Sequence, residues 1–370
     1  MKNLLIISYD YPPSNGGIAR LCSEVAVGMQ EYYESVKVIT LENVSDNRSY
    51  NFENVEVIRF SNKRILCEIS IFLYLFFRKE KRKTDVICGL WHPEATISYL
   101  AGFRNVFILG HGTEFLFGTS KLRKYFWLPV YAKWILKRAK LCIANSHYTE
   151  QLIQKINKKI RTEALPLAVN PDFFHPKHET VNGDGLLRIC TVSRVLKFKG
   201  HDFIAQTIAN LPEHLKNKIH WNIGGTGEYL EGLKQKIQEL KIEKQVTFHG
   251  FIPDEELPSF YSENNVFILC TREQETSTQV EGFGLVFLEA QACGLPVIGT
   301  RTGGIPDAIE PENGGWLIEQ DNEENLSSIL QEIIQYPEIL LRESEKARKR
   351  VEAQYTWEKY TKKLHQLLQH

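Results

Sequence analysis

The stretch EGFGLVFLEAQACGLPVIGT, residues 281–300, places a glycine-containing loop, a helix and an apolar strand in close succession. Gly282 and Gly284 predict a loop in which the backbone can approach a ligand, and a helix is expected to begin at about Gly284. The β-branched residues after Pro296 predict a buried strand over residues 296–299. A helix that leads directly into such a strand is typical of an α/β protein with a parallel sheet.

The same alternation of short apolar runs and longer helical stretches recurs on both sides of one interruption. Residues 166–185 hold three prolines, two glycines and many polar residues, and predict a linker. We therefore expect two Rossmann-like α/β domains, at residues 1–170 and 186–354, with ligands bound at the cleft between the carboxyl ends of their strands. A helix is expected over residues 338–369, with a kink at residues 355–357. Its last part, about residues 355–370, is expected to pack on the first domain. The predicted strands are Asn3–Ser8, Val36–Thr40, Val86–Gly89, Val106–Leu109, Leu141–Asn145, Leu187–Ser193, Ile219–Gly224, Gln245–Phe248, Val266–Leu269 and Pro296–Gly299.

Composition narrows the class of protein. The 370-residue chain has 45 basic and 45 acidic residues, which argues against a general nucleic-acid binder. Residues 1–170 carry 24 basic and 15 acidic residues, so the first half is positive and suits an anionic partner. The seven cysteines are scattered without a C-x-x-C pair, which predicts buried thiols in a reducing compartment. No secretory signal is recognised at the start, and the protein is expected to be cytoplasmic.

The strongest chemical signal is the pair of glutamates Glu281 and Glu289. The backbone N–H groups at the start of the predicted helix favour a phosphate. The donor is expected to bind along the backbone of Gly282, Phe283, Gly284 and Leu285. Glu289 is placed to bind a ribose diol, and Glu281 to orient sugar hydroxyl groups. Either acid by itself is as easily a surface residue.

A second motif, VSRVLKFKG at residues 192–200, ends the first strand of the second domain. Arg194 and Lys199 can supply the two positive charges that a pyrophosphate needs, both for binding and for stabilising it as it leaves. The chain has no D-x-D pair and no His or Cys cluster with metal-ligand spacing, so we expect no metal at the site. The neighbouring Lys197 is interpreted as solvated.

Four weaker signals lie at other predicted strand ends. Gly16 and Gly17 precede a helix and can present N–H groups to a phosphate or a sugar, although paired glycines are often only a turn. His111 follows a strand and can donate to a sugar hydroxyl, whereas a lone histidine is more often structural. Gly225 lies in a loop that can close on the nucleotide or simply turn into a helix, and the segment with Phe251 can offer backbone groups to the edge of the base.

Together these motifs resemble glycosyltransferase family 4, the retaining enzymes of the GT-B fold, over nearly the whole chain. The resemblance extends from YPPSNGG at residues 11–17 to YTWEKY at 355–360, and the run from residue 280 to 304 is similar to bacterial α-mannosyltransferases that act on lipid-linked acceptors. It implies a GT-B fold and a transferase that moves a hexose from a nucleoside-diphosphate sugar to a glycan or lipid-linked acceptor in polysaccharide biosynthesis. Because uridine donors are the commonest in this family, UDP-glucose is the expected donor, and GDP-mannose is the alternative.

The resemblance also implies a role for each matching residue. Glu289 would bind the ribose, Arg194 and Lys199 the pyrophosphate, and Glu281 with residues 282–285 the transferred sugar and distal phosphate. Gly17 would contact the phosphate from the other domain, and His111 would lie beside the sugar. Glu114 stands where the family often has aspartate, and the acidic segment around residues 271–280 is longer than usual, which leaves donor and acceptor preference open.

The α/β pattern leaves two rival functions. A dinucleotide-dependent oxidoreductase requires G-x-G-x-x-G and an acid about 20 residues further on, and neither half has them. A non-catalytic nucleotide- or carbohydrate-binding protein is disfavoured by the full set of Glu281, Glu289, Arg194 and Lys199.

Two stretches combine apolar and basic residues, and both suit either a helix packed on the sheet or a helix lying on anionic lipid. One is the 13-residue run 65–77 with the bases of residues 78–83, and the other is residues 121–140. The run is too short to span a bilayer, which takes about 20 residues. Packing on the sheet is favoured, and peripheral contact with the inner face of the plasma membrane stays an open expectation.

Overall fold

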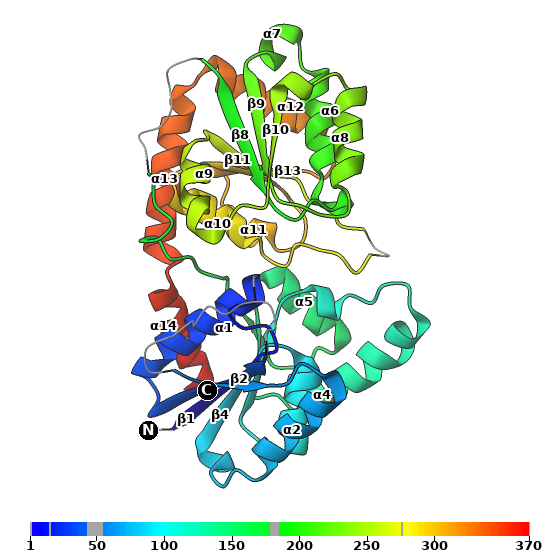
Figure 1. Cartoon of the computed structure of the whole chain (residues 1–370), viewed down its shortest axis with the longest axis vertical. Helices are drawn as coiled ribbons and strands as arrows, with labels where there is room; N and C mark the ends of the chain where they lie inside the picture. Colours follow the sequence, from blue (N-terminus) through cyan, green and yellow to red (C-terminus); the bar gives the residue numbers. More distant parts are fainter. Residues whose placement is uncertain (1, 15, 43–54, 178–184, 275–276, 370) are drawn as a thin grey trace. The chain divides into compact units, whose positions relative to one another are not determined.

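The computed structural model describes residues 2–14, 16–42, 55–177, 185–274 and 277–369. The chain forms two compact units (Figure 1). Unit 1 contains Met1–Leu167, Thr276–Thr278 and Trp357–His370, and unit 2 contains Ala168–Glu275 and Gln279–Thr356.

Unit 1 is built on a parallel sheet of seven strands in the order β3-β2-β1-β4-β5-β6-β7. Every residue of β4 and β5 is buried, because helices cover both faces of the sheet and leave the central strands no solvent-facing side. The strands are β1 (Asn3–Ile7), β2 (Ser35–Leu41), β3 (Glu56–Phe60), β4 (Thr84–Cys88), β5 (Val106–Gly110), β6 (Leu141–Ala144) and β7 (Thr162–Ala164).

The helices of unit 1 divide between the two faces of this sheet. The chain leaves β1 in one direction to reach β2, and moves in the opposite direction from β3 through β4 to β7, so right-handed crossovers place α1 on one face and α2 to α5 on the other. The helices are α1 (Gly17–Gly28), α2 (Arg64–Phe76), α3 (Thr96–Leu100), α4 (Lys133–Leu136), α5 (His147–Ile156) and α14 (Trp357–Gln369), and a π-helical segment, η5 (Arg123–Ala132), leads into α4.

Unit 2 has a parallel sheet of six strands in the order β10-β9-β8-β11-β12-β13. Its strands are β8 (Leu187–Val192), β9 (Ile219–Gly224), β10 (Val246–Gly250), β11 (Val266–Leu269), β12 (Val297–Thr300) and β13 (Gly315–Ile318). The helices are α6 (His201–Asn210), α7 (Glu213–Lys216), α8 (Leu230–Glu239), α9 (Leu257–Ser262), α10 (Leu285–Ala292), α11 (Ile305–Ala308), α12 (Glu323–Gln335) and α13 (Glu338–Gln354).

The predicted fold class is confirmed, because both units are Rossmann-like with parallel sheets. All ten predicted strands form, within a residue or two at each end. Sequence patterning missed β3, β7 and β13, each of which is the last strand at an edge of its sheet. Part of the predicted linker, residues 178–184, lies outside the described residues.

All seven cysteines lie in the described part of the chain, where they are buried and form no disulfide bond, as expected. Among the described helices, none combines the length and apolarity that crossing a bilayer requires.

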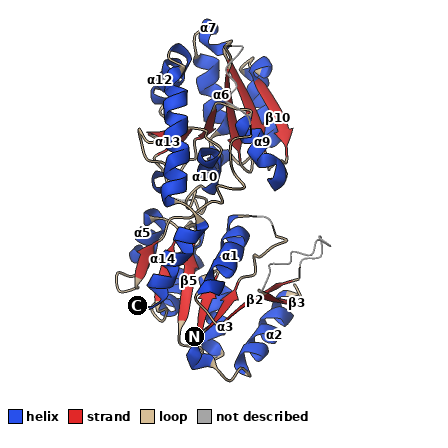
Figure 2. Ribbon diagram, turned by 90° about the vertical axis from the view of Figure 1, so that its left-hand side faces the viewer, coloured by secondary structure: helices blue, strands red, loops and turns tan. Residues whose placement is uncertain are grey.

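The C-terminal helical region divides where the sequence suggested a kink. Helix α13 ends at Gln354 and α14 begins at Trp357. Helix α14 packs against α1 in unit 1, where a side chain larger than hydrogen at Gly28 would collide with Thr361, and Figure 2 shows the two helices side by side. Leu364 and Leu368 of α14 are buried as a result.

Replacing Leu364 with alanine tests this packing. Leu364 is fully buried, so the change removes apolar burial and leaves a cavity, and we expect it to lower the free energy of unfolding by about 2–5 kcal/mol. Urea unfolding followed by circular dichroism measures the loss. The exposed neighbour Lys363→Ala is the control, with an expected change within about 0.5 kcal/mol. Equal stability of the two variants would show that α14 is not packed as described.

Candidate functional site

The predicted site residues of unit 2 gather at the carboxyl edge of its sheet. From β8 the chain proceeds to β9 and β10 on one side, and from β11 to β12 and β13 on the other, so β8 and β11 form the switch point of the sheet. Ligands of such sheets bind in the crevice at this position, because the loops after the two strands diverge there. The loop after β8 carries Arg194 and Lys199.

Lys199 is held close to Glu281. It ends a short helical turn, η6 (Lys197–Lys199), and its Nζ donates to Oε2 of Glu281 in an ion pair. The side chains are only 12% and 18% exposed, so water screens the pair less than it would at the surface. The structure thus brings together two residues that are 82 positions apart in the sequence and that the motifs singled out separately.

Arg272 fixes the loop that carries Lys199. The backbone N–H of Arg272, just beyond β11, donates to the carbonyl of Phe198 (2.6 Å), and its guanidinium pairs with Asp202 (2.6 Å) and Asp321 (2.7 Å). These charge-assisted bonds join the ends of β8 and β11 at the switch point. Sequence reasoning missed this role of Arg272, since its partners are distant in sequence.

The segment from Glu281 to Glu289 has the predicted loop-to-helix form. The carbonyl of Glu281 accepts from the N–H of Gly304 (2.9 Å), Gly282 and Phe283 are buried, and α10 begins at Leu285 directly after Gly284. The N–H of Phe287 donates to the carbonyl of Gly284 (3.0 Å), which leaves the N–H groups of Leu285 and Val286 without a carbonyl partner within that helix.

Glu289 lies deeper than an ordinary surface acid. It is 4% exposed, and its Oε2 accepts from the hydroxyl of Tyr261 (3.2 Å). Burial and the adjacent carboxylate raise the pKa of Tyr261 well above its usual value, so the hydroxyl remains a donor. Tyr261 is another residue that the sequence did not indicate, and binding of a ribose by Glu289 stays a prediction.

Gly225 allows a close backbone approach beside the Arg194 loop. Its φ is 127°, and a Cβ at this position would lie 1.9 Å from the carbonyl oxygen of Ser193. Arg194 itself is exposed at the sheet edge, as is Lys197. Phe251 is 64% exposed and follows β10, two strands away from β8.

In unit 1, His111 reaches the corresponding switch point, between β1 and β4. It follows β5, and its Nε2 lies 2.7 Å from the carbonyl oxygen of Gly89, which follows β4. A carbonyl only accepts, so Nε2 is the donor in this contact. Donation from His111 to a sugar hydroxyl stays a prediction. The N–H of His111 donates to Glu114 (2.6 Å).

Glu94 ties these loops together and was missed by sequence reasoning. Its carboxylate accepts from the N–H groups of Tyr9 (2.9 Å), after β1, and Leu90 (2.6 Å), after β4. Complete burial raises the pKa of Glu94 to about 8, and the two N–H donors oppose that rise. Glu94 therefore positions the peptide on which His111 rests.

Gly16 and Gly17 lie at the start of α1, where both are exposed. No side-chain hydrogen bond at the N-cap Gly16 is made to the start of α1, and the first-turn N–H groups have no carbonyl partner within the helix itself. Their contact with a phosphate stays a prediction. In the described residues of both units, no group of three or more His, Cys, Asp or Glu side chains is arranged to hold a metal ion.

Comparison with known proteins identifies a family that the residues of this site resemble. The family model described as "Glycosyl transferases group 1" matches residues 176–350, which include β8, α10 and all candidate residues of unit 2. Residues 176–350 are thus similar to the group 1 glycosyltransferases. The expected resemblance and the expected enzyme class are therefore confirmed.

Two curated relatives show how far the similarity extends. A protein of Mycolicibacterium smegmatis named GDP-mannose-dependent alpha-(1-6)-phosphatidylinositol monomannoside mannosyltransferase is 30% identical over 183 residues, 47% of each chain. A protein of Corynebacterium glutamicum named GDP-mannose-dependent monoacylated alpha-(1-6)-phosphatidylinositol monomannoside mannosyltransferase is 26% identical over 386 residues. The alignment covers 100% of this chain and 98% of that protein. Among solved structures, HepE of Anabaena in complex with UDP and glucose superimposes with a TM-score of 0.77 at 16% identity, with complete coverage of both chains.

The buried His201 makes stability depend on pH. It follows Lys199 by two residues, and burial, reinforced by the charge of Lys199, lowers its pKa to about 4. The folded protein keeps His201 neutral, whereas the unfolded chain takes up a proton below about pH 6.5. The free energy of unfolding should therefore fall by up to about 3 kcal/mol as the pH drops from 6.5 to 4.

Urea unfolding at a series of pH values measures this loss. His201→Gln is the comparison, because glutamine does not titrate, and the difference in stability between the two proteins should shrink toward pH 4. A difference that does not change with pH would contradict a neutral, buried His201.

Proposed function

We propose that this glycosyltransferase moves a mannosyl group from GDP-mannose to a lipid-linked or glycan acceptor, with retention of the anomeric configuration. The donor is inferred from relatives whose names specify GDP-mannose, one of which aligns over the full length of the chain. This replaces UDP-glucose, the first preference from the sequence, which stays as the alternative. A non-catalytic binding role is disfavoured by the family.

The observation that carries the proposal is the ion pair between Lys199 and Glu281 beside the first turn of α10. A diphosphate at this point would meet the ammonium of Lys199 and the N–H groups of Leu285 and Val286 at the helix start, which together favour negative charge. When phosphate oxygens take over Lys199, the carboxylate of Glu281 is released to accept from sugar hydroxyls. Donor binding thus exchanges one charge pair for another.

The chemistry then depends on stabilising the leaving group. In the proposed step the bond between the anomeric carbon and the diphosphate oxygen breaks, and the acceptor hydroxyl forms the new bond on the same face of the sugar. A phosphate oxygen of the departing nucleoside diphosphate takes up the hydroxyl proton, so no enzymic nucleophile is needed. Arg194 and Lys199 offset the negative charge that develops, and this replaces a metal ion in the proposal.

Removing one of these charges should abolish most of the transfer. Arg194→Ala and Lys199→Ala are each expected to lower kcat by about a hundredfold or more, because each loses stabilisation that grows in the transition state. Initial rates of the unmodified enzyme and of both variants are measured with and without a chelator. The comparison of variants tests the two charges, and the effect of the chelator on the unmodified enzyme tests whether a metal is needed.

Lys197→Ala, in the same loop and exposed, is the matched control and should keep its rate. Full activity of both Arg194→Ala and Lys199→Ala would refute the diphosphate assignment. Loss of all activity in the chelator with the unmodified enzyme would refute the absence of a metal.

The nucleotide can be identified by thermal shift. A ligand at 100 times its Kd stabilises the folded protein by roughly 2.7 kcal/mol, and we expect GDP and GDP-mannose to raise Tm while UDP and UDP-glucose leave it nearly unchanged. Glu289→Gln serves as the control for binding at this site and should reduce the shift. A larger shift with UDP-glucose would reverse the donor assignment, and a shift without turnover of any donor would favour a binding protein.

A further inference from the structure

Helix α2 is apolar on both its sides, although only one side packs on the sheet. Cys67, Ile71 and Leu75 face the core and are fully or almost fully buried. The opposite side would be expected to be polar in a helix that faces water. Instead it presents apolar side chains that are 45–74% exposed, namely Ile65, Leu66, Ile69, Leu73, Phe76 and Phe77.

The segment that forms η5 and α4 shows the same property. It exposes Leu122, Tyr125, Phe126, Val130 and Trp134, each between 46% and 69%. Among the described residues, twelve of the seventeen exposed large apolar side chains lie between positions 65 and 134 of unit 1. Such a concentration is unusual for a surface that meets only water.

These elements belong to one surface. Helices α2 to α4 cover the same face of the seven-stranded sheet, α2 contacts α3, and a pocket joins α3 to α4. We call this surface the α2–α4 face and define it by the exposed apolar residues of α2, η5 and α4 together with Leu100 of α3.

Positive charge surrounds the apolar residues of the α2–α4 face. Residues 115–149, which include η5 and α4, contain seven lysines and arginines and no acidic residue. Two cations lie directly on exposed rings: the guanidinium of Arg138 is 4.1 Å from the ring centre of Trp134, and Nζ of Lys81 is 5.0 Å from that of Phe76. The composition matches that of an interfacial membrane helix, which has aromatic and aliphatic residues on one side and basic residues around them.

The pocket between α3 and α4 combines the same chemistry in a small space. It has a volume of about 270 Å³ and is lined by Tyr99, Leu100, Phe103, Arg104, Trp134 and Arg138, so both charged residues in this lining are arginines. Arginine binds phosphate oxygens with two parallel hydrogen bonds. The apolar members can pack on the glycerol and upper acyl region of a lipid.

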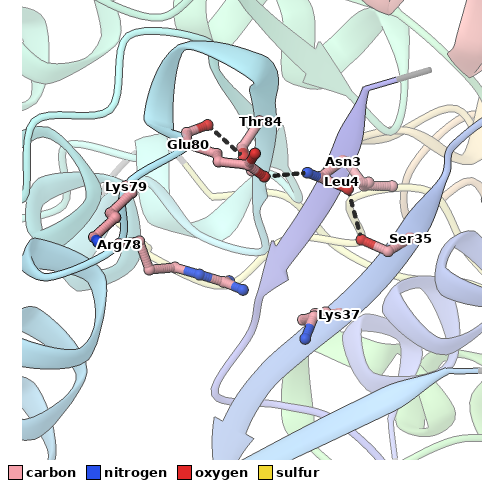
Figure 3. Close-up of a pocket in the computed structure, with 8 residues that line it drawn as sticks. All are labelled: Asn3, Leu4, Ser35, Lys37, Arg78, Lys79, Glu80 and Thr84. Carbon is pink, nitrogen blue, oxygen red and sulfur yellow. Dashed lines mark hydrogen bonds between the residues drawn. The ribbon is translucent and has the colours of Figure 1, made fainter.

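A second hollow, of about 290 Å³, lies at the C-terminal end of α2 and is less suited to an anion (Figure 3). Arg78, Lys79 and Lys37 line it, but so does Glu80, which accepts from the side chain of Asn3. Lys37 is also paired with Glu56. The acidic partners reduce the positive charge of this hollow, so the α3–α4 pocket is the better phosphate site.

We propose that the α2–α4 face rests on an anionic lipid bilayer, with its apolar side chains in the interface and a lipid phosphate in the α3–α4 pocket. A second copy of the chain is a poorer occupant, because a symmetric contact would bring the same bases together across the interface. A bilayer supplies both the apolar layer and the negative charge. The inference goes beyond the proposed transfer reaction and does not depend on it, since binding to vesicles is measured without donor or acceptor.

Co-sedimentation with lipid vesicles tests the proposal. We expect the full chain to bind vesicles of phosphatidylcholine and phosphatidylglycerol at least about tenfold more tightly than phosphatidylcholine alone, with the difference lost at high salt. Arg104→Glu/Arg138→Glu should remove most of this preference. Leu73→Glu should weaken binding by about tenfold or more, because it places a charge in the interface.

Matched controls separate this face from general charge and apolarity. Lys362→Glu/Lys363→Glu changes two exposed bases on α14, which packs on α1 at the opposite face of the sheet, and Leu341→Glu changes an exposed apolar residue of unit 2. Both controls should bind vesicles as the unmodified chain does, and circular dichroism checks that every variant is folded.

Three results would overturn the proposal. The first is equal binding to the two kinds of vesicle, and the second is equal loss in the control variants. The third is a dimer in sedimentation equilibrium that Leu73→Glu dissociates while vesicle binding is absent, which would assign the face to a contact between copies.

Discussion

Both units depend on one constraint, which is that every strand of each sheet runs parallel to its neighbours. The carboxyl ends of all strands then lie at the same edge, and every loop that leaves a strand begins there. Residues far apart in the sequence can therefore meet without any local signal. In unit 2 this brings Lys199, which follows β8, within an ion pair of Glu281, and in unit 1 it brings His111 to the carbonyl of Gly89.

The loops at these edges lack the ladder of hydrogen bonds that holds a strand, so other contacts must fix them. A Cβ at Gly200 would lie 1.8 Å from the carbonyl of Cys270, which shows how tightly the Lys199 loop is pressed against the end of β11. Arg272 adds charged bonds to the same junction. A cation held in this way loses little freedom when an anion arrives, and that is the condition under which it stabilises a developing charge effectively.

The sequence predicts what is local and periodic. The central strands are continuous apolar runs, and the segment from Glu281 to Glu289 contains its own loop, helix start and acids, so both were found. Three of the four edge strands, β3, β7 and β13, were not found. Strands β3 and β7 are only partly buried, and their patterns do not differ from those of loops. Glu94 and Arg272 were missed because their partners are determined by the order of the strands, which no short stretch of sequence encodes.

The covalent path of the chain has a consequence for how the two units fold. Unit 1 takes its residues from both sides of unit 2 in the sequence, because α14, which covers α1 with Leu364 and Leu368, follows unit 2. Unit 2 is nearly continuous in sequence, whereas unit 1 is completed only when a segment from beyond unit 2 packs on α1. A chain that has not yet docked α14 therefore leaves the apolar surface of α1 uncovered.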